Sequence, residues 1–148
     1  MIRKLLAHLL AYSTCVALAT NASAAQSATP CGDAKLRELA TIYKTYRAQR
    51  QHDPDLHTQE LSDWNGEMHR VMVRLGEELA TLSISTACLE TMLGAPDELR
   101  SSGQRHGSVM VERGAQHFVY WWRGGHDYLY LVVRDARVAQ ARWWFAYE

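Results

Sequence analysis

The spacing of apolar residues changes once along this chain, near residue 108. Before that point, apolar side chains recur at intervals of three and four, which is the period of a helix that buries one face. From Ser108 onward they recur at every second position, which is the period of a β-strand. Because helices come first and strands later, the pattern predicts an α+β fold without internal repeats.

Two long N-terminal helices are expected. The first follows Asp33, a good N-cap, runs to about Gln51 and stops before Pro54, which breaks it. The second carries an apolar stripe from Thr58 to Leu82. The short connection between the two stripes predicts an antiparallel helical hairpin.

Glycines and a capping serine mark two further features of the helical part. Gly66 and Gly76 interrupt the second stripe, which indicates close packing or a bend at those positions. A short third helix is expected from Thr86 to Leu93, with Ser85 as its N-cap and Gly94 at its C-terminal end.

Four strands are expected after a polar loop at residues 97–107. Their alternating segments read "SVMVE", "QHFVYWW", "DYLYLVV" and "RVAQARWWFAY". The links between them are short: Gly114–Ala115, Gly124–Gly125 and the region of Asp135–Ala136. Short links predict an antiparallel β-meander. Gly124–Gly125 favours a two-residue hairpin turn, because both positions can adopt positive φ.

The hairpin register divides the sheet into two faces. A two-residue turn at Gly124–Gly125 sets Trp121 opposite Tyr128. The more aliphatic face is expected to pack on the helices and holds Phe118, Tyr120, Trp122, Leu129, Leu131 and Val133, with Val109 and Val111 added by a two-residue turn at Gly114–Ala115. The second face holds Met110, Val119, Trp121, Tyr128, Tyr130 and Val132.

The last strand is expected to follow a loop of odd length at residues 134–138. A two-residue turn would place Gln140 and Arg142 in the core, at a cost of roughly several kcal/mol. A turn of three or five residues, with or without a bulge, reverses the parity. The core then receives Ala139, Ala141, Trp143 and Phe145, and the second face receives Arg142 and Trp144.

The first 24 residues read as a secretory signal peptide. Arg3 and Lys4 precede a short apolar run, and Ala22-Ser23-Ala24 fits the small-x-small cleavage rule. The apolar run is too short to span a bilayer. Cys15 lacks the sequence context of a lipidated cysteine. We therefore expect a periplasmic protein, not a lipoprotein, with a single domain at residues 25–148.

The mature chain excludes some classes of partner and predicts one disulfide. Removing Arg3 and Lys4 leaves 14 basic against 16 acidic residues, with no basic run that would suggest nucleic acid. No second long apolar run indicates a membrane span. Cys31 and Cys88 then remain as a pair, which an oxidising compartment favours as a disulfide that contributes roughly 4 kcal/mol.

The second face of the sheet is the candidate binding surface. It would display Trp121, Tyr128, Tyr130 and Trp144 around Arg142, a composition typical of binding surfaces for a protein or another envelope macromolecule. The alternative is a helix that covers this face and makes it a second core. The sequence gives the two interpretations equal weight and does not identify the oligomeric state.

No motif predicts an enzyme, a metal site or a cofactor. The loop "HDPDLH" gathers His52, Asp53, Asp55 and His57, but no further histidine stands at a diagnostic spacing for zinc. The competing class is a periplasmic hydrolase or metal-binding protein that uses His117, His126 and Asp127. No recognisable nucleophile accompanies these three residues, so a non-catalytic protein is expected.

The segment "LETMLGAPDEL" and the aromatic strands after it resemble a known arrangement. A short helix ends in Leu-Gly-x-Pro at Leu93, Gly94 and Pro96, and a β-meander follows. This is similar to the SmpA/OmlA outer-membrane-assembly lipoproteins and to the similarly built β-lactamase inhibitor proteins. The resemblance covers about the last 60 residues and implies a compact periplasmic or secreted binding module without catalysis.

Overall fold

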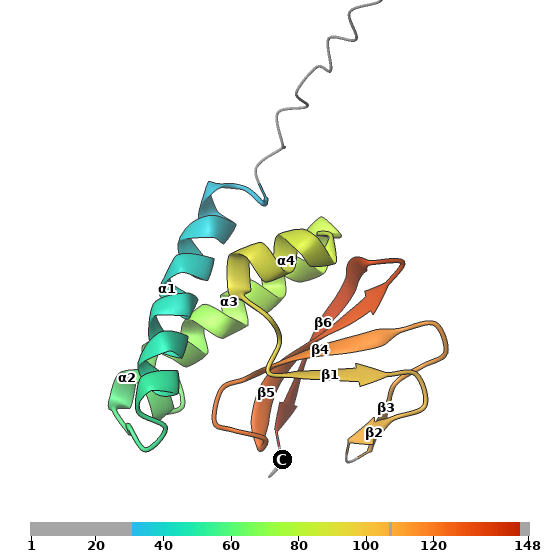
Figure 1. Cartoon of the computed structure of the whole chain (residues 1–148). Coiled ribbons are helices and arrows are strands. Elements are labelled where there is room, and N and C mark those ends of the chain that lie inside the picture. Colours follow the sequence, from blue (N-terminus) through green and yellow to red (C-terminus); the bar gives the residue numbers. More distant parts are fainter. Residues whose placement is uncertain (1–30, 107, 146–148) are drawn as a thin grey trace, which may run out of the picture.

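A computed structural model describes residues 31–106 and 108–145 and places the helices against one face of an antiparallel sheet (Figure 1). The α+β class is confirmed, whereas the expected signal peptide lies outside the described residues. The elements are α1 (Ala34–His52), α2 (Gln59–Ser62), α3 (Glu67–Leu82), α4 (Thr86–Leu93), β1 (Glu98–Ser101), β2 (Arg105–His106), β3 (Val109–Met110), β4 (Gln116–Trp121), β5 (Asp127–Arg134) and β6 (Arg137–Phe145).

Local capping signals place the ends of α1 and α4 where the sequence predicts them. The Asp33 carboxylate accepts a hydrogen bond from the backbone N–H of Leu36 at 2.8 Å, so α1 begins directly after it. The Ser85 hydroxyl caps α4 in the same way, and Gly94 follows α4 with a φ of 82°. Each of these signals acts within one turn of helix.

The predicted disulfide joins the start of α1 to α4. The Cα atoms of Cys31 and Cys88 lie 5.3 Å apart, and the two sulfur atoms are bonded. The bridge closes a long stretch of chain that contains α1, α2 and α3, which restricts the unfolded state. It therefore ties the N-terminal helix to the rest of the core.

The predicted second long helix is two helices, α2 and α3. The chain turns between them at Asn65, which has a φ of 63°. A Cβ atom added at Gly66 would lie 2.3 Å from the carbonyl oxygen of Gln59, so only glycine fits at this bend. Gly76 has a different role, because its missing side chain lets α3 approach Leu129 of β5.

The sheet has the strand order β1–β4–β5–β6. The register between β4 and β5 is confirmed, with Trp121 opposite Tyr128. The prediction for the edge next to β4 is wrong. The strand that pairs there is β1, which lies within the segment that was expected to be a polar loop. The residues expected to fill that edge form the short strand β3, which instead pairs with β2 in a separate ribbon (Figure 1).

This change moves the side chains of the displaced segment. Val111 is buried in the second cluster with Tyr128 and Tyr130, and Val109 packs against that cluster; the prediction that both valines join the helical core is wrong. The cause is that β1 already supplies the hydrogen bonds that β4 needs on this side. The displaced segment then folds across the second face.

The link between β5 and β6 reverses parity by a bulge and not by an odd-length loop. Asp135 and Ala136 have φ values of 49° and 55°, as in a two-residue hairpin turn. The register then shifts, because Val133 pairs with Val138 whereas Val132 pairs with Gln140. Ala139 is thus the extra residue and is exposed, contrary to the prediction that it faces the core.

Beyond the bulge, the predicted faces are confirmed. The helical core receives Ala141, Trp143 and Phe145, and the second face receives Trp144. The sheet therefore separates two hydrophobic clusters: a large one shared with the helices, and a smaller one on the other side around Val119, Tyr128 and Tyr130, which we call the second core. Within the residues that the structure describes, no helix has the length and apolar character needed to cross a membrane.

Candidate functional site

Only part of the predicted aromatic surface is exposed to solvent. Tyr128 and Tyr130 are only 1% and 5% exposed, so they lie inside the protein. Trp121 is 39% exposed, Arg142 is exposed and Trp144 is half-buried. The part of this face that solvent reaches is therefore Trp121, Trp144 and Arg142.

The middle of this face is covered by the segment between β1 and β4, and not by a helix. Val111 and Ala115 pack there against Tyr128 and Tyr130. Arg100, which is 4% exposed, adds a polar contact: its Nη1 donates to the Tyr128 hydroxyl at 3.1 Å, and its guanidinium lies 5.0 Å from the centre of that ring. The second face is therefore covered at Tyr128 and Tyr130 and open to solvent at Trp121 and Arg142.

The three residues of the competing enzyme hypothesis do not come together. His117 pairs with Val132, whereas Asp127 stands five residues earlier on β5, which separates the two by about 17 Å along the strand. Asp127 is buried and pairs with Arg123, with 2.6 Å between its Oδ2 and an arginine nitrogen. His126 is exposed in the turn.

His117 lies in the second core, on the ring of Tyr130 at a centroid distance of 5.0 Å. Burial lowers the pKa of His117, and the positive charges of Arg100 and Arg142 lower this pKa further. His117 is therefore neutral at neutral pH. The loop residues His52, Asp53, Asp55 and His57 are exposed, and no group of metal ligands occurs within residues 31–106 and 108–145.

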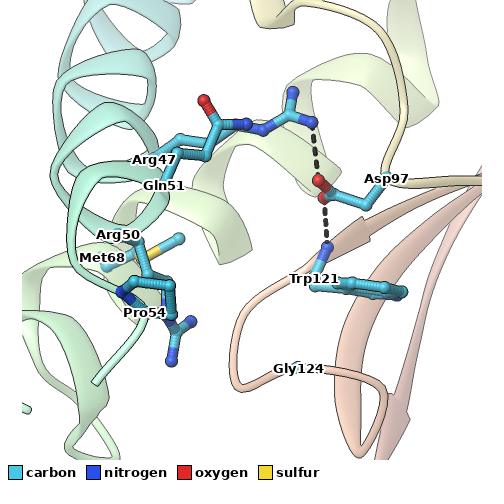
Figure 2. A pocket seen from close by; sticks show the side chains of 8 residues that line it. All are labelled: Arg47, Arg50, Gln51, Pro54, Met68, Asp97, Trp121 and Gly124. Atoms are coloured by element: carbon cyan, nitrogen blue, oxygen red, sulfur yellow. Dashed lines mark hydrogen bonds and ion pairs between the residues drawn. The ribbon is translucent and has the colours of Figure 1, made fainter. Parts of the chain in front are cut away.

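Trp121 stands at the border of a pocket that sequence reasoning did not predict. The pocket has a volume of about 340 Å³ and opens between the C-terminal half of α1 and the turn that follows β4 (Figure 2). We call it the Trp121 pocket. Its lining residues are Arg47, Arg50, Gln51, Pro54, Met68, Asp97, Trp121 and Gly124.

One wall of the Trp121 pocket is fixed by Asp97. Its Oδ1 accepts a hydrogen bond from Nη2 of Arg47 at 2.6 Å, and its Oδ2 accepts one from the backbone N–H of Trp121 at 2.9 Å (Figure 2). Nη1 of Arg47 also donates to the carbonyl oxygen of Leu93 at 3.0 Å. These contacts hold α1, the end of α4 and β4 together around the pocket.

The opposite wall carries a guanidinium without a counter-ion among the described residues. Arg50 forms no hydrogen bond or ion pair with any of them, and its Nη1 is buried. Burial lowers the pKa of Arg50, and the positive charge of Arg123 lowers this pKa further; the charge of Asp97 opposes both effects. Arg50 is thus partly removed from water beside a second cation.

The unpartnered polar atoms follow one stripe of α1. Within the part of the chain that the structure describes, three buried side-chain polar atoms have no hydrogen-bond partner: the Tyr43 hydroxyl, Nε of Arg47 and Nη1 of Arg50. These residues are spaced by four and three, so they share a face of the helix. The available sequence signal was this pair of arginines, which continues the apolar stripe of Leu39 and Tyr43.

A second aromatic group closes the far side of the helical core; Trp122 and Phe145 were predicted to face this core, but their contacts with Trp64 and His69 were not. Trp64 is 49% exposed, and its ring lies 4.5 Å from that of His69 and 5.1 Å from that of Phe145. Beneath it, the Trp122 indole N–H donates to the carbonyl oxygen of Leu61 at 2.9 Å. The rings contact one another, so this group forms part of the core packing.

Comparison with protein families, with curated proteins and with solved structures finds no match to this chain.

Proposed function

We propose that the protein is an exported, non-catalytic binding module that holds a partner protein in the cell envelope. The observation that carries the proposal is the exposed Trp121 at the border of a pocket that contains an arginine without a counter-ion among the described residues. Tryptophan and arginine are the residues most enriched at sites that dominate binding energy. A preformed concave site with few polar groups is also typical of a binding site.

The surface that we assign to the partner is smaller than the predicted aromatic face. Trp121, Tyr128 and Trp144 stand side by side on three adjacent strands, with Tyr128 buried between the two tryptophans. The Trp144 ring stacks on Tyr128 at a centroid distance of 6.4 Å. Tyr128 and Tyr130 thus support the surface from below, and Trp121, Trp144 and Arg142 are the residues that a partner reaches.

The export and the absence of catalysis rest on separate observations. The leader pattern of residues 1–24 and the Cys31–Cys88 disulfide favour an oxidising compartment, for which we propose the periplasm. The separation of His117 from Asp127 favours binding over hydrolysis. The module would act as an inhibitor or immunity protein, or as an accessory of envelope assembly; co-purification with the membrane fraction distinguishes the second role.

Affinity capture from the native envelope tests the proposal. The wild-type chain is compared with Trp121→Ala and Trp144→Ala, and with Leu82→Ala as a control, because Leu82 is equally exposed but lies at the end of α3. We expect the two tryptophan variants to lose the partner while their circular dichroism spectra stay native. If both tryptophan variants unfold, or if they retain the same partner as the control, the assigned surface is wrong.

A further inference from the structure

The charges at the Trp121 pocket do not balance. The residues that line it include two arginines, Arg47 and Arg50, against one carboxylate, Asp97; beside the pocket, Arg123 faces Asp127. Arg47 pairs with Asp97 and Arg123 pairs with Asp127. Arg50 is left with one positive charge in a partly desolvated position, which an accompanying anion would stabilise.

The neighbouring groups indicate a monovalent anion. Asp97 borders the same pocket, where its carboxylate accepts from Arg47 and from the Trp121 backbone, and it would repel a dianion such as phosphate more strongly than a monoanion. One carboxylate matches the single unbalanced charge of Arg50. A carboxylate also fits the planar fork of a guanidinium, which can donate two parallel hydrogen bonds to it.

The rest of the lining indicates what is attached to the carboxylate. Pro54 and Met68 give the Trp121 pocket an apolar wall beside Arg50, whereas the Trp121 ring points away from Arg50 at the border of the pocket (Figure 2). Its volume of about 340 Å³ has room for one or two amino-acid residues. The last residue of a polypeptide carries its carboxylate and its side chain on the same carbon, so both can enter one small pocket together.

We propose that the Trp121 pocket binds the C-terminal carboxylate of a partner polypeptide whose last side chain is apolar, with Arg50 as the anchoring cation. This inference rests on the proposed function and names the chemistry of the partner. Arg50 donates to the carboxylate, and the apolar side chain lies against Pro54 and Met68. Arg47 is held by Asp97 and orders the wall of the pocket.

Calorimetric titration with short peptides tests the proposal. The probe is N-acetyl-Ala-Phe with a free carboxylate, and it is compared with its C-terminal amide, with N-acetyl-Glu-Ala-amide and with inorganic phosphate. We expect saturable binding of the free acid. The amide and Arg50→Gln should each weaken that binding by about ten- to a hundredfold, as expected for a charge-assisted hydrogen bond. Arg74→Gln, at an exposed arginine of α3, should leave binding unchanged.

Each alternative occupant has its own outcome. Equal binding of the acid and its amide, or an unchanged affinity in Arg50→Gln, would overturn the proposal. Tighter binding of phosphate, or of the peptide with the glutamate side chain, would assign the pocket to a different anion. Self-association that Arg50→Gln abolishes would assign it to a second copy of this chain.

Two controls separate this inference from the proposed function and from loss of fold. Arg50→Gln should unfold at a temperature no lower than that of wild type, because the substitution removes a desolvated charge. Envelope capture is then repeated with this variant beside Trp121→Ala. Loss of the partner in Trp121→Ala alone overturns the carboxylate anchor and leaves the binding surface standing, whereas retention in both variants overturns both proposals.

Discussion

The second core contains a buried arginine, Arg100, and the Trp121 pocket contains a half-buried one, Arg50; the two differ in their partners. In the second core, Nε and Nη2 of Arg100 donate to the Glu98 carboxylate at 2.7 and 2.6 Å, and Nη1 donates to Tyr128. In the pocket, Arg50 has no such partner among the described residues. Both side chains carry the same charge, so the surroundings alone make the difference.

This difference indicates that the fold itself supplies the partners of Arg100, whereas a ligand would supply those of Arg50. Native proteins pair nearly all their buried polar groups, and those left unpaired call for an explanation. Arg100 is explained by its contacts, because it joins β1 to β5 under the segment that covers the second face. The unpaired Nη1 of Arg50 is explained if a group outside the described chain supplies its acceptor. Departures from local consistency of this kind are expected at functional sites.

The largest effect is expected where the paired arginine is removed. Arg100→Met keeps the apolar stem but removes the hydrogen bonds that Arg100 donates to the Tyr128 hydroxyl and to the Glu98 carboxylate. We expect a loss of about 2 kcal/mol in the free energy of unfolding, measured by urea denaturation. Arg105→Met, at an exposed position of β2, should change it by about 0.5 kcal/mol or less. An equal loss in both variants would show that the pairing of Arg100 contributes little.

The second largest expected effect is a gain in stability, from removal of the unpaired arginine. Arg50→Met removes an unpaired charge and leaves an apolar side chain beside Pro54 and Met68, so we expect a gain of about 1 kcal/mol in the free energy of unfolding. Urea midpoints with an unchanged slope would measure it. Arg74→Met serves as the surface control on α3. A destabilised Arg50→Met would place Arg50 with Arg100 and remove the distinction between the two regions.

The range over which a signal acts explains which parts of the fold the sequence predicts. Signals that act over a few residues are reliable: Asp33 and Ser85 cap helices, and Gly124–Gly125 sets the register of β4 and β5. Strand β1 was missed because its residues neither alternate nor look apolar. Its strand conformation depends on pairing with β4, which lies far along the chain, and on Arg100 reaching Tyr128.

The residues of the candidate site were also predicted only where a local pattern places them. Trp121, Trp144 and Arg142 were predicted because an alternating pattern determines which face they occupy. Arg47, Arg50 and Asp97 were missed because they meet only after α1 packs beside the sheet. Burial of Tyr128 and Tyr130 also could not be predicted, since it depends on the displacement of the segment around Val111.

The smallest effect is a dependence on pH that reports on the second core. The pKa of His117 is lowered by burial and by the charges of Arg100 and Arg142, which the carboxylate of Glu112 opposes in part. The unfolded chain therefore takes up its proton at a higher pH than the folded protein does. The stability contributed by neutral His117 is complete above about pH 6.5 and is lost as the pH falls through the lowered pKa of the folded state.

Substitution of His117 tests this dependence by urea denaturation between pH 7.5 and about 5. We expect His117→Gln to flatten the loss of stability on acidification, whereas His57→Gln, at an exposed loop position, should leave it unchanged. Some dependence will remain, because burial also lowers the pKa of His69 on the helical side of the sheet. If His117→Gln and wild type lose stability in parallel, the second core tolerates a third positive charge beside Arg100 and Arg142. Its polar groups would then be less tightly paired than the contacts of Arg100 indicate, and the contrast with the Trp121 pocket would weaken.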